Sequence, residues 1–166
     1  MLKKAFLGIG TNLGDRESNL KEALIMIEES IGTIVASSSV YETEPWGFES
    51  ENEFLNMVIQ VQTDLGPSGL LGRILMIEAH LGRIRDEGQY SSRIIDIDIL
   101  LYGDEVIDKI SLKIPHPRIS ERKFVLVPLC EIVPDLVHPV LKKSLTSLLH
   151  QCQDSAKVKL YKKQQA

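Results

Sequence analysis

The chain has 166 residues, of which 43% are hydrophobic, and a formal net charge of −4 at pH 7. This length suits one domain, whose core can fold without disulfides or a structural metal. The acidic balance argues against a general nucleic-acid binder, because that affinity depends on neutralising phosphates, although it is compatible with a local basic pocket for one small phosphorylated ligand.

Other sequence features narrow the class of protein further. No apolar run is long enough to cross a membrane, and the run after Lys4 is too short for a signal peptide. Cys130 and Cys152 match no zinc or redox motif, which indicates reduced core thiols in a cytoplasmic protein. The polar, lysine-rich tail from about residue 154 is expected to be weakly ordered.

The first part of the chain alternates between strand and helix patterns. Residues 4–9 form a short apolar run, which predicts a buried strand. Residues 15–31 predict a helix, because apolar residues recur along them at helical spacing. Val, Ile, Ser and Thr dominate residues 33–43, which predicts a second strand, and the stretch 44–53 is expected to form a loop.

Residues 54–63 alternate so regularly that both faces of the predicted strand can be assigned. One face carries only apolar side chains: Leu55, Met57, Ile59 and Val61. The opposite face is more polar and carries Phe54, Asn56, Val58, Gln60 and Gln62. We therefore expect one face to pack on helices and the other to line a wetter site.

The remaining elements complete the predicted order. Residues 67–81 are predicted to form a helix that begins at a proline, residues 83–93 a polar, mobile loop, and residues 94–101 a strand. A short strand near Val106 and a helix over 144–152 follow. The order strand-helix-strand-strand-helix-strand is typical of a ferredoxin-like α+β sandwich, with helices on a mostly antiparallel sheet and a C-terminal extension.

Asp96 and Asp98 occupy alternate positions of the predicted strand, so both side chains point to one face, opposite Ile95, Ile97 and Ile99. Two neighbouring carboxylates in an apolar strand repel each other and lose hydration. A hard divalent cation relieves both costs and takes phosphate oxygens as further ligands. The alternative is a half-exposed strand with two solvated aspartates.

Three arginines, Arg83, Arg85 and Arg93, precede this strand. Guanidinium groups bind phosphate oxygens with two parallel hydrogen bonds, so arginines beside paired aspartates indicate a phosphate-transfer site. Alternatively, each arginine pairs on the surface with one of three acidic residues, Glu78, Asp86 and Glu87.

A second group of side chains suits a flat heterocycle. It contains Trp46, Phe48, Phe54, Tyr90 and Phe124. Phe54 shares a strand face with Asn56, so an aromatic face and an amide edge lie together. Ordinary core aromatics are the alternative, and for Phe124 they are the better default. His116, held between two prolines, could donate a hydrogen bond to phosphate.

The glycines of residues 8–14 suggest a nucleotide-binding loop, but their spacing is not Gly-x-Gly-x-x-Gly. No crossover helix separates the predicted strands at 33–43 and 54–63, so the βαβ unit of a dinucleotide fold is missing. A tight turn that caps the first helix through Asp15 is preferred.

With these motifs together, the sequence resembles the 6-hydroxymethyl-7,8-dihydropterin pyrophosphokinases of folate biosynthesis. The most specific blocks are Arg-x-x-Asp-x-Asp-Ile at 93–99 and Pro-His-Pro-Arg at 115–118. The likeness continues through residues 8–14, 41–47, 54–56, 82–85 and 121–129. It implies one pyrophosphokinase domain over residues 1–166 with a ferredoxin-like fold. The implied reaction transfers pyrophosphate from ATP to the pterin, aided by two Mg²⁺ ions, in a cytoplasmic monomer without nucleic-acid or membrane partners.

The resemblance also implies roles for individual residues. Asp96 and Asp98 match the magnesium ligands and, with Arg83 and Arg93, form the expected catalytic set. The residues expected at the pterin are Thr43, Pro45, Trp46, Phe54, Asn56, Tyr90 and Phe124. Those expected at ATP are Glu78, Arg83, Arg85, Arg93, Ile99, Ser111, Lys113, His116 and Arg122.

The chain departs from the family pattern in the loops. Glu44 stands where proline is frequent, and Tyr90-Ser91-Ser92-Arg93 replaces Trp-Gly-Pro-Arg. Ser111 and Lys113 replace residues that help to hold the nucleotide in some members. Two other functions are alternatives: a ferredoxin-like RNA-binding module, which the acidic charge disfavours, and a metal-dependent phosphohydrolase that would use the same aspartates without needing a pterin.

Overall fold

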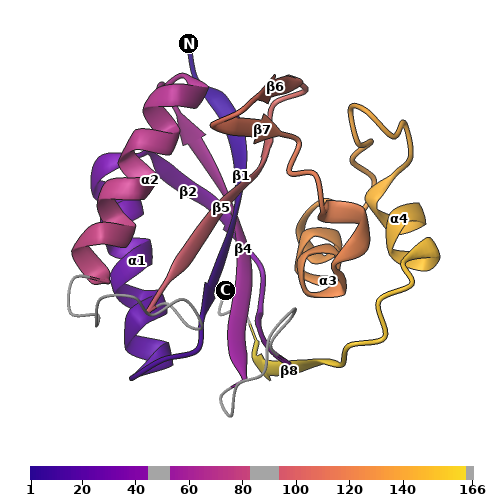
Figure 1. Cartoon of the computed structure of the whole chain (residues 1–166), viewed down its shortest axis with the longest axis horizontal. Coiled ribbons are helices and arrows are strands. Elements are labelled where there is room, and N and C mark those ends of the chain that lie inside the picture. Colours follow the sequence, from indigo (N-terminus) through magenta and orange to yellow (C-terminus); the bar gives the residue numbers. More distant parts are fainter. Residues whose placement is uncertain (45–52, 83–93, 164–166) are drawn as a thin grey trace.

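The computed structural model describes residues 1–44, 53–82 and 94–163. Within these ranges, six strands form one sheet, with α1 and α2 on one face and α3 and α4 on the other (Figure 1). A small hairpin, β6–β7, lies apart from this sheet. The elements are β1 (Lys3–Thr11), α1 (Arg16–Ser30), β2 (Thr33–Ser37), β3 (Val40–Thr43), β4 (Phe54–Thr63), α2 (Pro67–Leu81), β5 (Asp96–Tyr102), β6 (Ile107–Lys109), β7 (Leu112–Ile114), a 3₁₀ turn (Ile119–Glu121), α3 (Lys123–Ile132), α4 (Leu145–Gln151) and β8 (Val158–Lys162).

The mixed architecture with an antiparallel sheet, predicted from the sequence, is confirmed. The strand order is β5-β1-β4-β3-β8, β2 also pairs with β4, and every pairing is antiparallel. β1 lies between β4 and β5, so residues far apart in the chain become neighbours across it. No helix in the described ranges is long and apolar enough to span a membrane.

Local sequence signals set most of the element boundaries. Strand β4 and helix α2 cover the predicted residues, and α2 begins at Pro67, whose missing N–H costs nothing at a helix start. Helix α1 is capped by Asp15, whose side chain accepts a hydrogen bond from the Ser18 N–H at 3.1 Å. This cap agrees with the preference for a helix-capping turn over a nucleotide loop.

The single strand predicted over 33–43 is two strands, because two buried serines interrupt the ladder. Ser38 Oγ accepts a hydrogen bond from the Val58 N–H at 2.9 Å. Ser39 turns toward α3. Its hydroxyl donates a hydrogen bond to Glu131 Oε2 at 2.7 Å, and its N–H donates one to Glu131 Oε1 at 2.9 Å. At the junction of β2 and β3, these side-chain hydrogen bonds therefore supplement the single backbone bond that remains to β4, from the Ser38 N–H to the Val58 carbonyl oxygen at 2.8 Å.

Each face of the sheet has its own hydrophobic core. The face under α1 and α2 buries the apolar set of β4 together with Ile95, Ile97 and Ile99. The face under α3 and α4 buries Phe6, Val58 and other side chains. The alternation assigned to β4 and β5 is therefore confirmed, and the aspartates of β5 lie on the α3 side.

Four elements in the second half of the chain were not predicted: β7, the 3₁₀ turn, α3 and β8. The apolar run after residue 123 forms α3, which covers the second face of the sheet. Residues 158–162, expected to lie in a weakly ordered tail, form β8 and pair with β3. A lysine-rich strand carries little apolar signal of its own, because pairing with a neighbour defines it. Cys130 and Cys152 are free thiols beside the α3 core.

Candidate active site

A cavity of about 190 Å³ opens on the α3 side of the sheet. Its walls come from β1, β3, β4, β5 and the start of α3. The lining residues are Gly8, Ile9, Gly10, Thr43, Glu44, Phe54, Asn56, Met57, Val58, Asp96, Asp98, Leu100, Arg122, Phe124 and Val125. Seven of the residues predicted from the sequence therefore meet in one cavity: Thr43, Phe54, Asn56, Asp96, Asp98, Arg122 and Phe124.

The floor of the cavity depends on two glycines of β1. Gly10 pairs with Asn56 on one side and Asp96 on the other, and Gly8 pairs with Val58 and Asp98. A Cβ at position 10 would lie only 2.7 Å from Asn56 Oδ1. The strand was predicted to end at residue 9, before the helix-capping turn, but β1 continues to Thr11 and contains both glycines. Their alternate spacing inside a strand was the signal for a close approach that a side chain would block.

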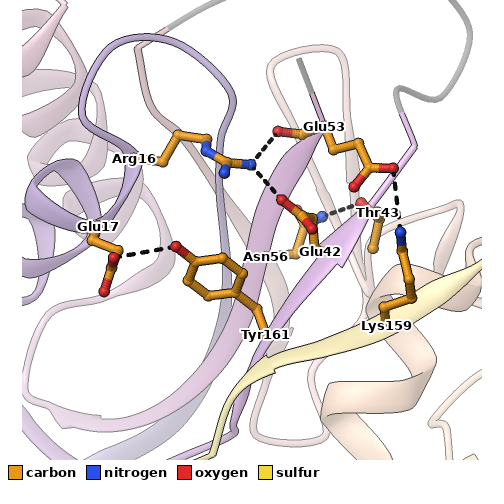
Figure 2. A network of polar contacts seen from close by, with 8 residues as sticks. All are labelled: Arg16, Glu17, Glu42, Thr43, Glu53, Asn56, Lys159 and Tyr161. Atoms are coloured by element: carbon orange, nitrogen blue, oxygen red, sulfur yellow. Dashed lines mark hydrogen bonds and ion pairs between the residues drawn. The ribbon is translucent and has the colours of Figure 1, made fainter. Parts of the chain in front are cut away.

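Asn56 presents a buried amide to the cavity. It is 6% exposed, and its Nδ2 donates a hydrogen bond to Thr43 Oγ1 at 2.5 Å (Figure 2). Thr43 is 2% exposed. Phe54 from β4 and Phe124 from α3 both line the same cavity. The site therefore joins two aromatic rings from different elements with an oriented polar edge, as a flat heterocycle requires.

Asp96 and Asp98 form the acidic side of the cavity. Both line it from β5, with Asp96 half-buried and Asp98 exposed. No group of three or more His, Cys, Asp or Glu side chains in the described ranges is placed to hold a metal ion. Two carboxylates alone still fit magnesium, which typically takes one or two protein carboxylates and completes its shell with water and substrate phosphates.

Arg122 connects the acidic and aromatic sides. Its guanidinium lies 5.6 Å from the centroid of the Phe124 ring, within cation–π range. Burial lowers the pKa of Arg122, and the charge of Asp98 partly offsets this effect. An arginine keeps its proton under such a shift, so the cavity holds a partly desolvated cation beside the carboxylates.

His116 lies within electrostatic range of Asp98. Burial lowers its pKa, while the charge of Asp98 opposes that effect. Its Nδ1 accepts a hydrogen bond from the Arg118 N–H at 3.1 Å. In the neutral ring this bond leaves the proton on Nε2, which can donate to a phosphate oxygen.

The other predicted ATP residues lie around β5 and the hairpin. Glu78 Oε2 accepts the Ile97 N–H at 2.8 Å and so covers the outer edge of β5. Ile99 is 6% exposed and packs in the α1–α2 core. Ser111 and Lys113 are exposed on the β6–β7 hairpin, where Lys113 Nζ forms an ion pair with Asp108 at 2.6 Å.

Some predicted site residues fall outside the described ranges. They are Pro45, Trp46, Arg83, Arg85, Tyr90 and Arg93. The cavity also contains residues that were not assigned to the site from the sequence, chiefly Gly8 and Gly10. Only the pairing of β1 with β4 and β5 shows that these residues line it.

Comparison with known proteins shows which family the chain matches. Residues 6–134 match the family model for 7,8-dihydro-6-hydroxymethylpterin-pyrophosphokinase (HPPK). The chain is 44% identical over 140 residues to the 2-amino-4-hydroxy-6-hydroxymethyldihydropteridine pyrophosphokinase of Aquifex aeolicus, covering 84% of this chain and 86% of that protein. It is 43% identical over 129 residues to the enzyme of the same name from Bacillus subtilis, covering 77% of each.

Solved structures show the same fold. A Plasmodium falciparum HPPK-DHPS triple mutant with STZ-DHP superimposes with a TM-score of 0.77 at 20% identity. The match covers 91% of this chain and 43% of that one, so this chain corresponds to less than half of the two-part protein. On the family model and the relatives, the chain belongs to the 7,8-dihydro-6-hydroxymethylpterin-pyrophosphokinase family.

Proposed function

We propose that the chain transfers the pyrophosphoryl group of ATP to the hydroxymethyl oxygen of 6-hydroxymethyl-7,8-dihydropterin, and that AMP is the other product. The observation that carries this proposal is the shared cavity, in which Asn56 and two phenylalanines lie beside Asp96 and Asp98. A site for phosphate hydrolysis alone has no use for an aromatic slot with an amide at its edge.

The pterin would occupy the side of the cavity formed by β3, β4 and α3. Phe54 and Phe124 can stack on the two faces of its ring, and Asn56 can bond its polar edge. The bond from Asn56 to Thr43 fixes the amide orientation before the substrate arrives. By the family resemblance, Pro45, Trp46 and Tyr90 are also proposed as pterin contacts.

The triphosphate would lie along β5. Asp96 and Asp98 supply the oxygen ligands that two Mg²⁺ ions prefer, and the bound ions would offset the charge of the phosphates. Arg122 and His116 add a guanidinium and an N–H donor on the same side. Arg83, Arg85 and Arg93 precede β5 in the chain and are proposed as further phosphate contacts.

The nucleoside end of ATP is proposed to follow the outer edge of β5. This strand ends the sheet, and Glu78 already binds the Ile97 N–H there. Ile99 lies two residues further along, and its backbone groups are the proposed contacts of the nucleobase at the same edge. Ser111 and Lys113 on the hairpin that follows β5 complete the proposed nucleotide contacts.

The reaction follows from placing both substrates in line. The pterin hydroxyl oxygen attacks the β-phosphorus, the new O–P bond forms, and the bond from that phosphorus to the AMP oxygen breaks. AMP leaves with the bonding electrons, and the hydroxyl proton passes to solvent. The described cavity lining contains no His, Lys or Cys, and Asp96 and Asp98 are assigned to the metal, so positioning and electrostatic stabilisation provide most of the acceleration.

The remaining inferences concern the whole molecule. If β2 and β3 together count as the second strand, the sheet order supports a ferredoxin-like sandwich. We infer one pyrophosphokinase domain over residues 1–166, acting in the cytoplasm as a monomer.

An assay of AMP release with and without the pterin tests the proposal. AMP should form only when ATP, Mg²⁺ and 6-hydroxymethyl-7,8-dihydropterin are all present. Release of AMP at the same rate without the pterin would instead identify a phosphohydrolase. Replacing Mg²⁺ by a chelator should abolish turnover if Asp96 and Asp98 act as ligands.

A further inference from the structure

We propose that the C-terminal segment 154–162 is a positioning element for the pterin side of the active site, acting through Arg16 on α1 and through the start of α3. This inference rests on the proposed function. The family model matches only residues 6–134, so the segment lies beyond the part that defines the family.

The segment first extends the sheet beside the pterin contacts. β8 pairs with β3 so that Val158 lies opposite Thr43 and Lys159 opposite Glu42. Lys159 Nζ also lies 3.7 Å from Glu53 Oε1, at the start of β4 (Figure 2). An edge strand without a partner frays easily, so this pairing stabilises the strand that carries Thr43.

Arg16 joins the two strand ends that approach the pterin. Its Nη1 donates hydrogen bonds to Glu42 Oε2 and to the Glu53 carbonyl oxygen, both at 2.9 Å. Glu42 precedes Thr43 on β3, and Glu53 precedes Phe54 on β4. The Arg16 and Glu42 side chains are only about a quarter exposed, which strengthens the charged hydrogen bond relative to a surface pair.

β8 holds Arg16 in place. The Arg16 guanidinium lies 5.7 Å from the centroid of the Tyr161 ring. Tyr161 Oη donates to Glu17 Oε2 at 3.2 Å, and Lys162 Nζ lies 3.3 Å from Glu17 Oε1. Figure 2 shows Arg16 between Tyr161 and the ends of β3 and β4. The Tyr161 ring, itself held by Glu17, restricts the guanidinium to the geometry that reaches both strands.

The same segment caps α3, the helix that carries Phe124 at the cavity wall. Asp154 Oδ2 accepts the Lys123 N–H at 3.0 Å, and its Oδ1 accepts the Ala156 N–H at 2.9 Å. Lys123 is the first residue of α3, and its flanking residues Arg122 and Phe124 line the cavity. A carboxylate at a helix start satisfies an N–H that the helix cannot.

The Arg16 contacts act on β3 and β4 at the pterin side, whereas Asp96 and Asp98 lie on β5 at the opposite edge of the sheet. Removing the Arg16 guanidinium should therefore weaken pterin binding selectively. We expect Arg16→Met to raise the KM for the pterin about tenfold and to leave the KM for ATP within about twofold, since small misplacements of positioning groups carry large costs. Arg16→Lys, which keeps the charge, should lie between wild type and Arg16→Met.

Arg73→Met is the matched control. Arg73 Nη1 donates to the Ser30 carbonyl oxygen at 3.1 Å and joins α2 to α1 away from the cavity. Both KM values should stay at the wild-type level. Asp154→Ala tests the contact with the start of α3. This variant should bind the pterin more weakly, as measured by calorimetry in the presence of a non-hydrolysable ATP analogue.

The outcomes separate this inference from the proposed function. A wild-type protein that forms no AMP with both substrates overturns the proposed function and the inference with it. An active wild type refutes the positioning role if Arg16→Met changes both KM values equally, or neither, even when its melting temperature falls. If Arg16→Met does not fold, the ratio of the two KM values in Arg16→Lys decides: a raised ratio supports the role, and an unchanged ratio refutes it.

Discussion

Gly10→Ala should damage the pterin pocket from within β1. The new Cβ would lie 2.7 Å from Asn56 Oδ1 and 3.7 Å from Phe54 Cδ1. The second distance is an ordinary contact, but the first forces the Asn56 amide to move by roughly half an ångström or more in a close-packed site. Asn56 is buried and bonded to Thr43 at 2.5 Å, so it cannot turn aside without losing that bond.

The expected loss follows from the buried hydrogen bond. Disrupting one buried polar pair costs about 1–3 kcal/mol, so kcat/KM for the pterin should fall about 5- to 150-fold. Overpacking should lower the free energy of unfolding by about 1–3 kcal/mol. Initial rates of AMP formation at varied pterin concentration give the first quantity, and urea denaturation gives the second.

A double variant tests whether Asn56 transmits the effect. In an Asn56→Ala background the clash is absent, so Gly10→Ala should add little further loss of kcat/KM. Gly72→Ala is the control, because a Cβ there meets nothing within 4 Å on an exposed face of α2. This control variant should leave activity unchanged and raise the free energy of unfolding by about 0.5–1 kcal/mol. Near-normal kcat/KM for Gly10→Ala, or fully additive losses in the double variant, would refute the reasoning.

Three further variants probe the proposed metal site, the contact of Glu131 on α3 with the sheet, and the hydrophobic core. Asp96→Ala should lower kcat at least about a hundredfold while its circular dichroism stays native, and near-normal turnover would contradict the magnesium assignment. Burial alone would raise the pKa of Glu131, but hydrogen bonds from Ser39 and Tyr41 lower it overall. The Glu131 contribution to stability is therefore present above the ordinary glutamate range and lost as the pH falls through the lowered pKa; Glu131→Gln should flatten this part of the stability profile, and an unchanged profile would count against the contact. Ile59→Ala, at a fully buried position, should cost roughly 2–5 kcal/mol in urea denaturation, and a smaller loss would indicate that the core repacks.

The sequence by itself determined the features that depend on local periodicity. Alternation along 54–63 and 94–101 is enough to place Asn56 on the polar face of one strand and Asp96 with Asp98 on one face of another. Pro67 marks a helix start because of its own covalent geometry. The motif blocks also identified the family, since their order and separation are properties of the chain alone.

Tertiary structure decided the features that depend on partners distant in the chain. Gly8 and Gly10 face the aspartates only because β1 pairs with β5, some ninety residues later. The break after β2 comes from serines that bond to Val58 and Glu131. β8 exists because β3 offers it an edge, which no pattern within a lysine-rich tail can reveal. Helical and strand periodicity are encoded locally, whereas strand pairing and cavity walls are set by which distant segments come into contact.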